Sequence, residues 1–311
     1  MLNVSSENTR TFSRRGVLAI LGGVAAAGLL PTPRARAGGA SSSALAFDGT
    51  ALVVAGEQVW RFDPFGDATL LPAPRRSIRA LACHPDRAGR LLASLDGGGL
   101  DRSDDGGRTW AAASGDLPLA QVTALAIAAG APDTIYAALA GDGLWRSEDA
   151  GNSWSFVMDR PWIAEAEREI LTLASVNLAS GMGGIWIYAG TDQGVTRVPD
   201  CFCRWQDVVE GDAMDALVAG RPSVPEAPLP KGEPITALVS AHATPERLYA
   251  ALPSGLWAST DGGVAWENRS SLHAQALAVD PADPDHIAAT YATKLKHSRD
   301  GGTAWATLAA L

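Results

Sequence analysis

The sequence predicts an all-β fold, a single β-propeller of six four-stranded blades, and three observations support this prediction. The pattern Ser-x-Asp-x-Gly-x-x-Trp occurs four times, beginning at Ser103, Ser147, Ser259 and Ser298. Short apolar runs separated by Gly, Pro and Asp precede each copy, as in chains of short strands and tight turns. The units recur at about 46 residues, a period typical of four-stranded propeller blades.

Residues 1–37 have the features of an export signal. Arg14 and Arg15 stand directly before the fifteen apolar residues 16–30, and Ala35-Arg36-Ala37 supplies a small-residue cleavage pattern. The arginine pair resembles a twin-arginine signal, which implies a bacterial protein that is exported in the folded state. Because fifteen residues fall short of the roughly 20 needed to span a bilayer, we expect a cleaved leader rather than an uncleaved anchor. The mature protein would then be periplasmic or secreted, without a membrane span.

The remaining chain, residues 40–311, is predicted to form the propeller. Equivalent second strands are expected over residues 135–139 and 248–252, and equivalent third strands begin at Gly143 and Gly255. These four-stranded units are the clearest copies of the repeat.

Two weaker units complete the ring. Residues 52–70 contain Trp60, in register with Trp145, and residues 170–208 end in a degenerate copy of the turn. In this degenerate copy, Asp200 and Trp205 align with Asp149 and Trp154 without a gap. Six units therefore fill the chain after the leader.

The repeated octapeptide has a structural interpretation as the turn between the third and fourth strands of a blade. An Asp in such a turn accepts backbone N–H groups, and Gly supplies a positive φ. The Trp begins the next strand, where its large area packs against a neighbouring blade. The residues assigned to this role are Ser103, Asp105, Gly107, Trp110, Ser147, Asp149, Gly151, Trp154, Ser259, Asp261, Gly263, Trp266, Ser298, Asp300, Gly302 and Trp305.

This combination of turns and blades resembles the BNR or Asp-box repeat family over the whole chain after the leader. The family includes sialidases and other glycoside hydrolases, the sortilin luminal domain, and photosystem II assembly and stability factors. The resemblance implies the propeller fold, but the fold hosts hydrolases, receptors and assembly factors alike.

A sialidase-like activity would require a Tyr nucleophile and arginines that hold a substrate carboxylate. Three tyrosines share one second-strand position: Tyr136, Tyr188 and Tyr249. Three arginines share one third-strand position: Arg61, Arg146 and Arg197. Only Tyr291 lies outside that tyrosine register, and the Phe/Tyr-Arg-Ile-Pro sequence of sialidases is absent. We therefore assign no catalytic residue and favour a non-catalytic binding or assembly module, with a degenerate exo-sialidase-like glycoside hydrolase as the alternative.

Turns between second and third strands, and connections between blades, should share the face opposite the Asp turns. Two long connections, residues 158–169 and 209–234, belong to that face, and such loops are usually functional or disordered. A short helix is expected over residues 162–169. The candidate binding residues on this face are Glu57, Asp96, Asp142, Trp162, Asp192, Gln193 and Lys294. The expected partner is another exported or membrane-associated protein, with carbohydrate as a further candidate.

Charge and cysteine content limit the classes of partner, metal and cofactor that we expect. Losing the leader, with five basic residues and one acid, changes the net charge from −9 to −13, which disfavours nucleic acid as a partner. Cys201 and Cys203 replace turn residues in the fourth unit, and they could form a disulfide, bind a soft metal such as Cu(I), or remain inert thiols. Two cysteines fall short of a structural zinc signature, so we assign no metal and expect no cofactor.

Overall fold

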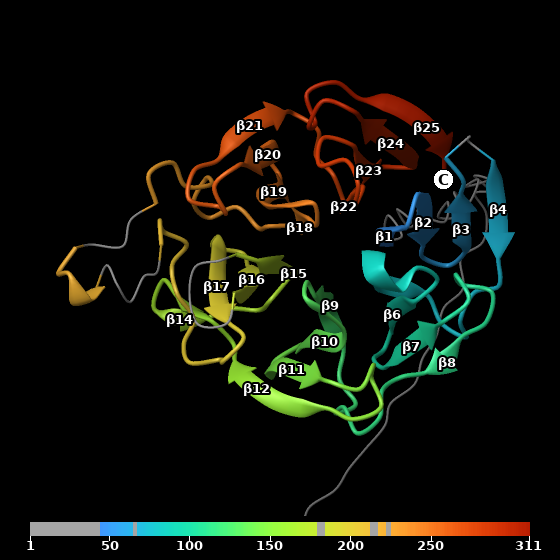
Figure 1. Ribbon diagram of the computed structural model, residues 1–311, viewed down its shortest axis with the longest axis horizontal. Helices are drawn as coiled ribbons and strands as arrows, with labels where there is room; N and C mark the ends of the chain where they lie inside the picture. The colour runs from blue at the N-terminus through green and yellow to red at the C-terminus, as the bar shows by residue number, and fades with distance from the viewer. Residues whose placement is uncertain (1–43, 65–66, 179–183, 212–216, 222–224) are drawn as a thin grey trace, which may run out of the picture. The chain divides into compact units, whose positions relative to one another are not determined.

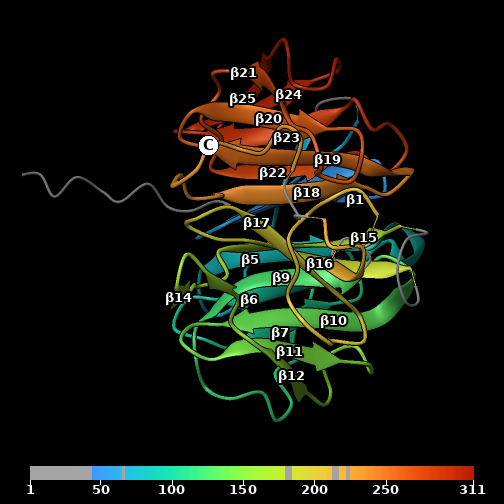
Figure 2. The same cartoon turned by 90° about the vertical axis from the view of Figure 1, so that its left-hand side faces the viewer.

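A computed structural model describes residues 44–311, except residues 65–66, 179–183, 212–216 and 222–224. Its sheets form a ring of six blades (Figure 1), which confirms the six-bladed propeller. Figure 2 turns the ring so that blades 4 and 5 face the viewer. Residues Ala40–Leu311 form one compact unit. The proposed leader, residues 1–37, lies outside the described part of the chain.

Blades 1 to 3 each contain four antiparallel strands that follow one another in the chain. Blade 1 has β1 (Ala44–Asp48), β2 (Ala51–Ala55), β3 (Val59–Phe62) and β4 (Ala68–Leu71). Blade 2 has β5 (Ile78–Cys83), β6 (Leu91–Leu95), β7 (Leu100–Ser103) and β8 (Ala111–Ala112), and the 3₁₀ helix η1 (Pro85–Arg87) follows β5. Blade 3 has β9 (Val122–Ala128), β10 (Ala131–Leu139), β11 (Gly143–Ser147) and β12 (Ser155–Asp159).

Blades 5 and 6 also have four strands, whereas blade 4 has three. Blade 4 has β15 (Thr172–Asn177), β16 (Ile185–Gly190) and β17 (Val195–Pro199). Blade 5 has β18 (Ala237–Ala241), β19 (Thr244–Leu252), β20 (Gly255–Ser259) and β21 (Glu267–Ser270). Blade 6 has β22 (Ala276–Val279), β23 (Ile287–Tyr291), β24 (Lys294–Ser298) and β25 (Ala306–Ala310).

In the part of the chain that the structure describes, the ring closes without a strand shared between its first and last blades. The innermost strands contact one another in the order β1, β5, β9, β15, β18 and β22, and β22 contacts β1. Each blade is built from one contiguous stretch of chain. Among the residues that the structure describes, no hydrogen-bonded sheet contains strands from both the first and the last blade, so these blades meet by side-by-side packing.

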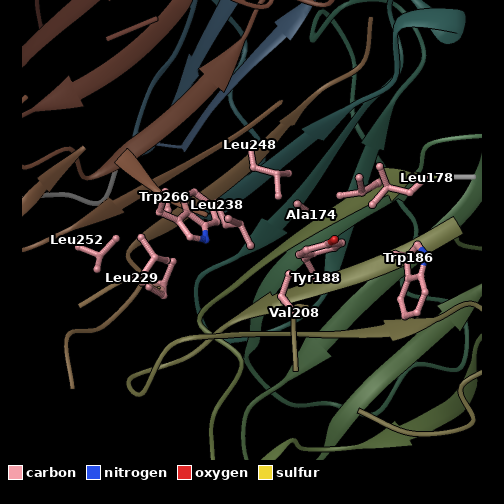
Figure 3. Close-up of a cluster of buried hydrophobic side chains, with 13 residues drawn as sticks. Ala174, Leu178, Trp186, Tyr188, Val208, Leu229, Leu238, Leu248, Leu252 and Trp266 are labelled. Atoms are coloured by element: carbon pink, nitrogen blue, oxygen red, sulfur yellow. The ribbon is translucent and has the colours of Figure 1, made fainter. Parts of the chain in front are cut away.

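The second strands lie at the centre of each blade and are buried on both faces. All residues of β2 and β6 are buried, which explains why their sequences are continuous apolar runs rather than alternating ones. Figure 3 shows the largest apolar cluster, in which Tyr188 and Trp186 of blade 4 accompany Leu238, Leu248 and Trp266 of blade 5. The core thus lies between neighbouring blades, where burial of apolar area stabilises the ring.

The helix expected over residues 162–169 is wrong. The segment forms a hairpin of β13 (Trp162–Ile163) and β14 (Ala166–Glu167). Its two turn residues, Ala164 and Glu165, have φ values of 51° and 61°, as the short hairpin turns that match strand twist require. Glu167 and Glu169 pair with Arg160, and Arg168 pairs with Asp192 of blade 4.

Blade 4 departs from the expected four strands. In place of a fourth strand, Gln206 forms an isolated bridge with Arg197 of β17, with backbone N···O distances of 3.0 and 2.7 Å. The preceding turn contains Cys201, Phe202 and Cys203, which lack the Gly found in the other turns. The degenerate sequence therefore yields a shortened outer edge rather than a complete blade.

Candidate functional site

The four Ser-x-Asp-x-Gly-x-x-Trp segments, here called the Ser/Asp turns, share one hydrogen-bond network. In each turn the buried Ser hydroxyl donates to Asp Oδ1 at 2.7–2.9 Å and accepts the Gly N–H at 2.8–2.9 Å. The same Asp oxygen accepts two further backbone N–H groups at 2.8–3.0 Å. The turn residues thus satisfy backbone groups that the sharp turn leaves unpaired.

Two of these carboxylates are strongly held in the ionised form. Hydrogen bonds from Thr109 and Ser103 lower the pKa of Asp105 to about 2. Hydrogen bonds from Ser153 and Ser147 likewise lower the pKa of Asp149 to about 2. Carboxylates that remain ionised down to such low pH serve as hydrogen-bond acceptors and are unsuited to general acid catalysis near neutral pH.

The turn tryptophans join neighbouring blades. Four indoles donate Nε1–H toward the preceding blade or its connection: Trp110 to Pro72 O, Trp154 to Ala113 O, Trp205 to Asp159 O and Trp305 to Ser270 Oγ. Trp266 is buried in the cluster between blades 4 and 5. Each of these five indoles therefore has a structural role at a contact between blades.

The tyrosines and arginines of the repeat positions are also engaged in structural contacts. Tyr188 OH and Tyr249 OH donate to carbonyls of the following blade, at 2.8 and 2.9 Å. Arg61 pairs with the buried Asp48 at 2.6 Å. The buried Arg197 donates to Tyr188 OH and to the carbonyls of residues 209 and 211. Burial raises the pKa of Tyr136 to about 12, so these groups do not resemble a poised nucleophile with substrate-holding arginines.

The predicted binding residues lie at corresponding ends of different blades and are spread around the ring. Most occupy or flank turns between second and third strands: Glu57, Asp96, Asp142, Asp192, Gln193 and Lys294. Asp96 pairs with Arg79, and Asp142 accepts from the indole of Trp145 at 2.8 Å. Tyr291, the tyrosine outside the repeat register, is 42% exposed at the end of β23.

One of these residues, Asp192, is linked to the β13–β14 hairpin that carries Trp162. Trp162 is 68% exposed on this hairpin. Arg168 donates to Ile163 O at 3.0 Å and reaches Asp192 of blade 4 at 3.4 Å. Sequence reasoning identified Trp162 and Asp192 separately, but it could not foresee that Arg168 connects the backbone of this hairpin to Asp192 of blade 4.

The central channel contains a cavity of about 450 Å³ that the sequence did not reveal. It is lined by the later parts of the first strands and by the loops that follow them, opposite the face with the predicted binding residues. His84 and His242, from blades 2 and 5, lie edge to face across it with ring centroids 5.5 Å apart. Both residues directly follow a first strand, β5 or β18, as their sequence positions indicate, and this places them at the same end of the channel.

Both ring nitrogens of His84 have hydrogen-bond partners within the protein. Its Nδ1 accepts the Asp86 N–H at 3.1 Å, and its Nε2 lies 3.2 Å from Ala129 O. Burial lowers the pKa of His84. Both ring nitrogens are therefore used, which leaves His84 without a free lone pair for a ligand.

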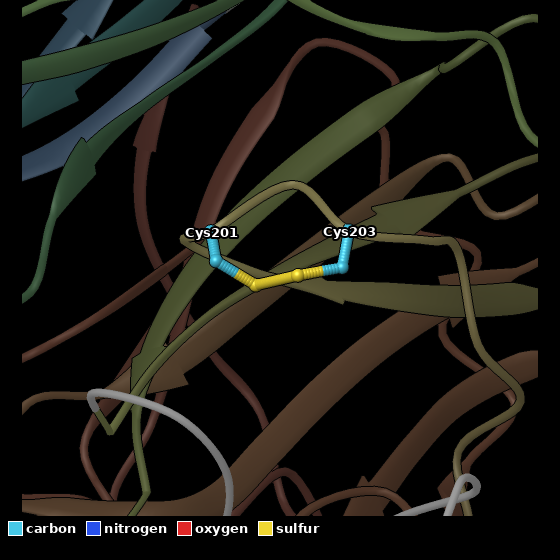
Figure 4. The surroundings of a disulfide bond; sticks show 2 residues. All are labelled: Cys201 and Cys203. Atoms are coloured by element: carbon cyan, nitrogen blue, oxygen red, sulfur yellow. A yellow bond between two sulfur atoms is a disulfide. The ribbon is translucent and has the colours of Figure 1, made fainter.

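Cys201 and Cys203 are joined by a disulfide (Figure 4). Cys83 is a free thiol whose pKa is raised well above its usual range by burial and by the nearby Asp48 carboxylate. In the described part of the chain, no three His, Cys, Asp or Glu side chains are grouped as a metal site would require. Within the same residues, no helix has the length and apolar character to cross a membrane.

Comparisons with known proteins return similar structures only. No family model matches the chain, and no curated protein does. A GH74 xyloglucanase from Xanthomonas campestris is 19% identical, covering 85% of this chain and 45% of that one, with a TM-score of 0.51. The GH74 enzyme of Niastella koreensis is 13% identical, covering 86% and 47%, with a TM-score of 0.52. A YCF48 structure bound to a D1 peptide is 13% identical, covering 86% and 82%, with a TM-score of 0.49.

The chain has the fold of a β-propeller. It spans less than half the length of the two GH74 enzymes. At identities of 13–19%, the likeness extends to the fold alone, which hosts many functions.

Proposed function

We propose that this chain is an exported, non-catalytic β-propeller that binds another protein, with the β13–β14 hairpin as its docking element. The observation that supports the proposal is Trp162, an indole 68% exposed to solvent on an ordered hairpin. Tryptophan is enriched among the few residues that supply most of the energy of protein interfaces. An exposed indole outside the repeat register has no role in blade packing.

Ion pairs and a hydrogen bond hold the hairpin against blades 3 and 4 in the free protein. Arg160 pairs with both Glu167 and Glu169, and Glu169 accepts the Gly141 N–H of blade 3 at 3.1 Å. Arg168 joins the other side of the hairpin to blade 4 through Asp192. A side chain held on a rigid element loses less conformational entropy on binding, so a larger share of the contact energy appears as affinity.

The proposed compartment rests on residues 1–37. Their paired arginines, apolar run and cleavage pattern support export by a twin-arginine route to the periplasm or beyond. The partner is then another exported or membrane-associated protein. The net charge of −13 without the leader disfavours nucleic acid, and the Ser/Asp turns support membership of the Asp-box repeat family.

Alanine substitution at the hairpin tests the docking element. The chain without its leader is used to crosslink and identify a partner, which is then purified and titrated by calorimetry. We expect Trp162→Ala to weaken binding by about 30-fold, the effect of a 2 kcal/mol hot spot. Leu70→Ala, which removes a side chain 53% exposed on β4, serves as the control and should leave the affinity unchanged. Equal affinities for the wild type and Trp162→Ala would exclude the hairpin.

Enzyme assays test the non-catalytic assignment separately. We expect no release of sugar from sialosides or from other glycosides. Tyr291 is the tyrosine that blade packing leaves unexplained. Hydrolysis by the wild type that disappears in Tyr291→Phe would show that the chain is a glycoside hydrolase.

A further inference from the structure

One position on the second strand of a blade is a tyrosine in three successive blades. Tyr136, Tyr188 and Tyr249 each lie opposite the third-strand residue that directly precedes the Ser/Asp turn or, in blade 4, its degenerate copy. Tyr188 OH donates to Gly262 O of blade 5 at 2.8 Å. Tyr249 OH donates likewise to Pro284 O of blade 6 at 2.9 Å. A tyrosine at this position therefore fills space between two blades and supplies a hydrogen bond across the seam.

Blade 6 has an alanine at this position. Ala288 lies opposite His297, the residue before Ser298, so it is the counterpart of the three tyrosines. Its side chain is fully buried and ends at the methyl group, so it leaves the volume of a phenol ring unfilled. A cavity of about 190 Å³, here called the seam cavity, lies at this place between blades 6 and 1, with Ala288 in its wall. The seam cavity therefore corresponds to the space that a tyrosine ring fills between other blades.

The seam cavity has a buried apolar wall and an exposed rim. Phe47, Leu52 and Phe62 of blade 1 line it and are buried. Asp63 of blade 1 and Leu308 of blade 6 line it as well, and both residues are exposed to solvent. A ligand can therefore enter from solvent, and an aromatic ring in the cavity would gain edge or offset contacts with the two phenylalanine rings.

The volume of the seam cavity limits the size of its ligand. Pockets for drug-sized molecules measure about 300–1,000 Å³, which is more than the 190 Å³ found here. An apolar cavity of roughly 150 Å³ in a different protein binds benzene. The seam cavity therefore accommodates a single six-membered aromatic ring with a small substituent, and it is too small to enclose an oligosaccharide or a peptide segment.

The polar side chains around the seam cavity favour a neutral hydroxyl group on the ligand. Asp63 and Asp280 present carboxylates, and Arg299 presents a guanidinium. A ligand carboxylate would meet the two acids as well as the arginine, and a ligand ammonium would meet the arginine as well as the acids, so like charges oppose either one. A hydroxyl can donate to a carboxylate and accept from a guanidinium without carrying charge.

We propose that the seam between blades 6 and 1 binds a small phenol, whose ring takes the place of the tyrosine that blade 6 lacks. The ring packs against Phe47 and Phe62, and the hydroxyl meets Asp63 or Arg299 at the rim. The seam cavity borders turns that follow first and third strands, whereas the β13–β14 hairpin lies between blades 3 and 4 in the chain. The inference therefore goes beyond the proposed protein docking, and neither site depends on the other.

The probe is p-cresol, which is the tyrosine side chain as a free molecule. Calorimetric titration of residues 40–311, the compact unit that holds the propeller, should give saturable binding with one molecule per chain. Ala288→Tyr restores the missing ring and should lower the affinity for p-cresol by roughly tenfold or more, because a close-packed interior has no second space for a ring. Ala111→Tyr, which adds the same side chain on the exposed strand β8 of blade 2, is the matched control and should leave the affinity unchanged. Toluene, which lacks the hydroxyl, and p-toluate, which carries a carboxylate, should each bind roughly fivefold more weakly than p-cresol, as the loss of one hydrogen bond implies.

Three results would overturn the proposal. These are the absence of saturable p-cresol binding, an undiminished affinity in Ala288→Tyr, which would place the ligand elsewhere, and binding of toluene or p-toluate as tight as that of p-cresol. Circular dichroism checks that Ala288→Tyr is folded. If it is not, Ala288→Leu replaces it, because the shorter side chain still occupies part of the seam cavity. An affinity for p-cresol in Ala288→Leu equal to that of the wild type would then contradict the proposal.

Discussion

At the scale of single residues, the buried serine hydroxyl organises each Ser/Asp turn. Ser147 Oγ accepts the Gly151 N–H at 2.8 Å and donates to Asp149 at 2.9 Å, with only 1% of the residue exposed. We expect Ser147→Ala to lower the free energy of unfolding by about 1–3 kcal/mol, because the Gly151 N–H is left buried and unpaired. Denaturant unfolding measures this loss. Ser153→Ala removes an exposed hydroxyl from the same Asp and should cost less; an equal or larger cost would contradict the assignment.

The carboxylate of the same turn gives a pH prediction. The Ser153 hydroxyl, 2.6 Å from Asp149 Oδ2, is the main cause of the pKa of about 2. Because this pKa is below its ordinary value of 3.8, the stabilisation is present above about pH 4 and is lost as pH falls toward 2. Ser153→Ala should raise the pKa of Asp149, as measured by carboxyl carbon NMR. An unchanged titration of Asp149, with Asp105 as internal reference, would show that the backbone donors alone suffice.

At the scale of elements, the turn after β17 replaces the Ser/Asp network with a disulfide. The Cys201–Cys203 bond encloses Phe202, whose φ of 51° lies in the left-handed region. The Phe202 ring packs on Tyr136 and Arg146 of blade 3, at 6.0 and 5.5 Å. The covalent link thus positions an aromatic contact between blades where no Gly is present.

Removing this link should have a moderate effect. We expect the double substitution Cys201→Ser and Cys203→Ser to lower the free energy of unfolding by roughly 1–2 kcal/mol, because a crosslink over so short a loop restrains the unfolded chain only slightly. Chemical denaturation gives the value, and wild type treated with dithiothreitol should match the double variant. Stability unchanged by both treatments would mean that the disulfide has no part in holding the turn.

At the scale of the whole molecule, closure by packing alone predicts tolerance to circular permutation. New ends placed at Leu119, 91% exposed on the connection between blades 2 and 3, with the old ends joined by a flexible linker, interrupt no sheet. We expect the same circular dichroism spectrum and one cooperative unfolding transition, because chain ends in exposed connections are well tolerated. A permutant opened inside β10, within a buried strand, is the control that should fail to fold. Failure of the Leu119 permutant as well would show that closure needs the native chain order.

The features that recur from blade to blade could be predicted from the sequence, whereas the hairpin and the channel cavity, which occur once, could not. The shared register of Tyr188 and Tyr249, like that of the turn serines, is visible in the sequence because equivalent residues make the same contacts in different blades. The β13–β14 hairpin occurs once, and its shape depends on Arg160 and Arg168 reaching partners that no pattern specifies. The channel cavity is likewise lined by the first strands of all six blades, so no single repeat indicates it.

Since no described strand is shared between the first and last blades, the time at which the ring can close during synthesis depends on when the last blade is made. During synthesis each blade can form as soon as its own stretch of chain leaves the ribosome, since domains and motifs fold from the N-terminus onward. Leu45 and Phe47 of the first blade nevertheless cannot make their native contacts until Ala278 and Ala288 of the last blade have been synthesised. These contacts are the most distant in sequence, so we expect them to be the slowest to form. The ring can close only after β22 and β23, the strands that contain Ala278 and Ala288, have left the ribosome. On the proposed twin-arginine route, which carries folded cargo, this last contact is the event that makes the molecule ready for export.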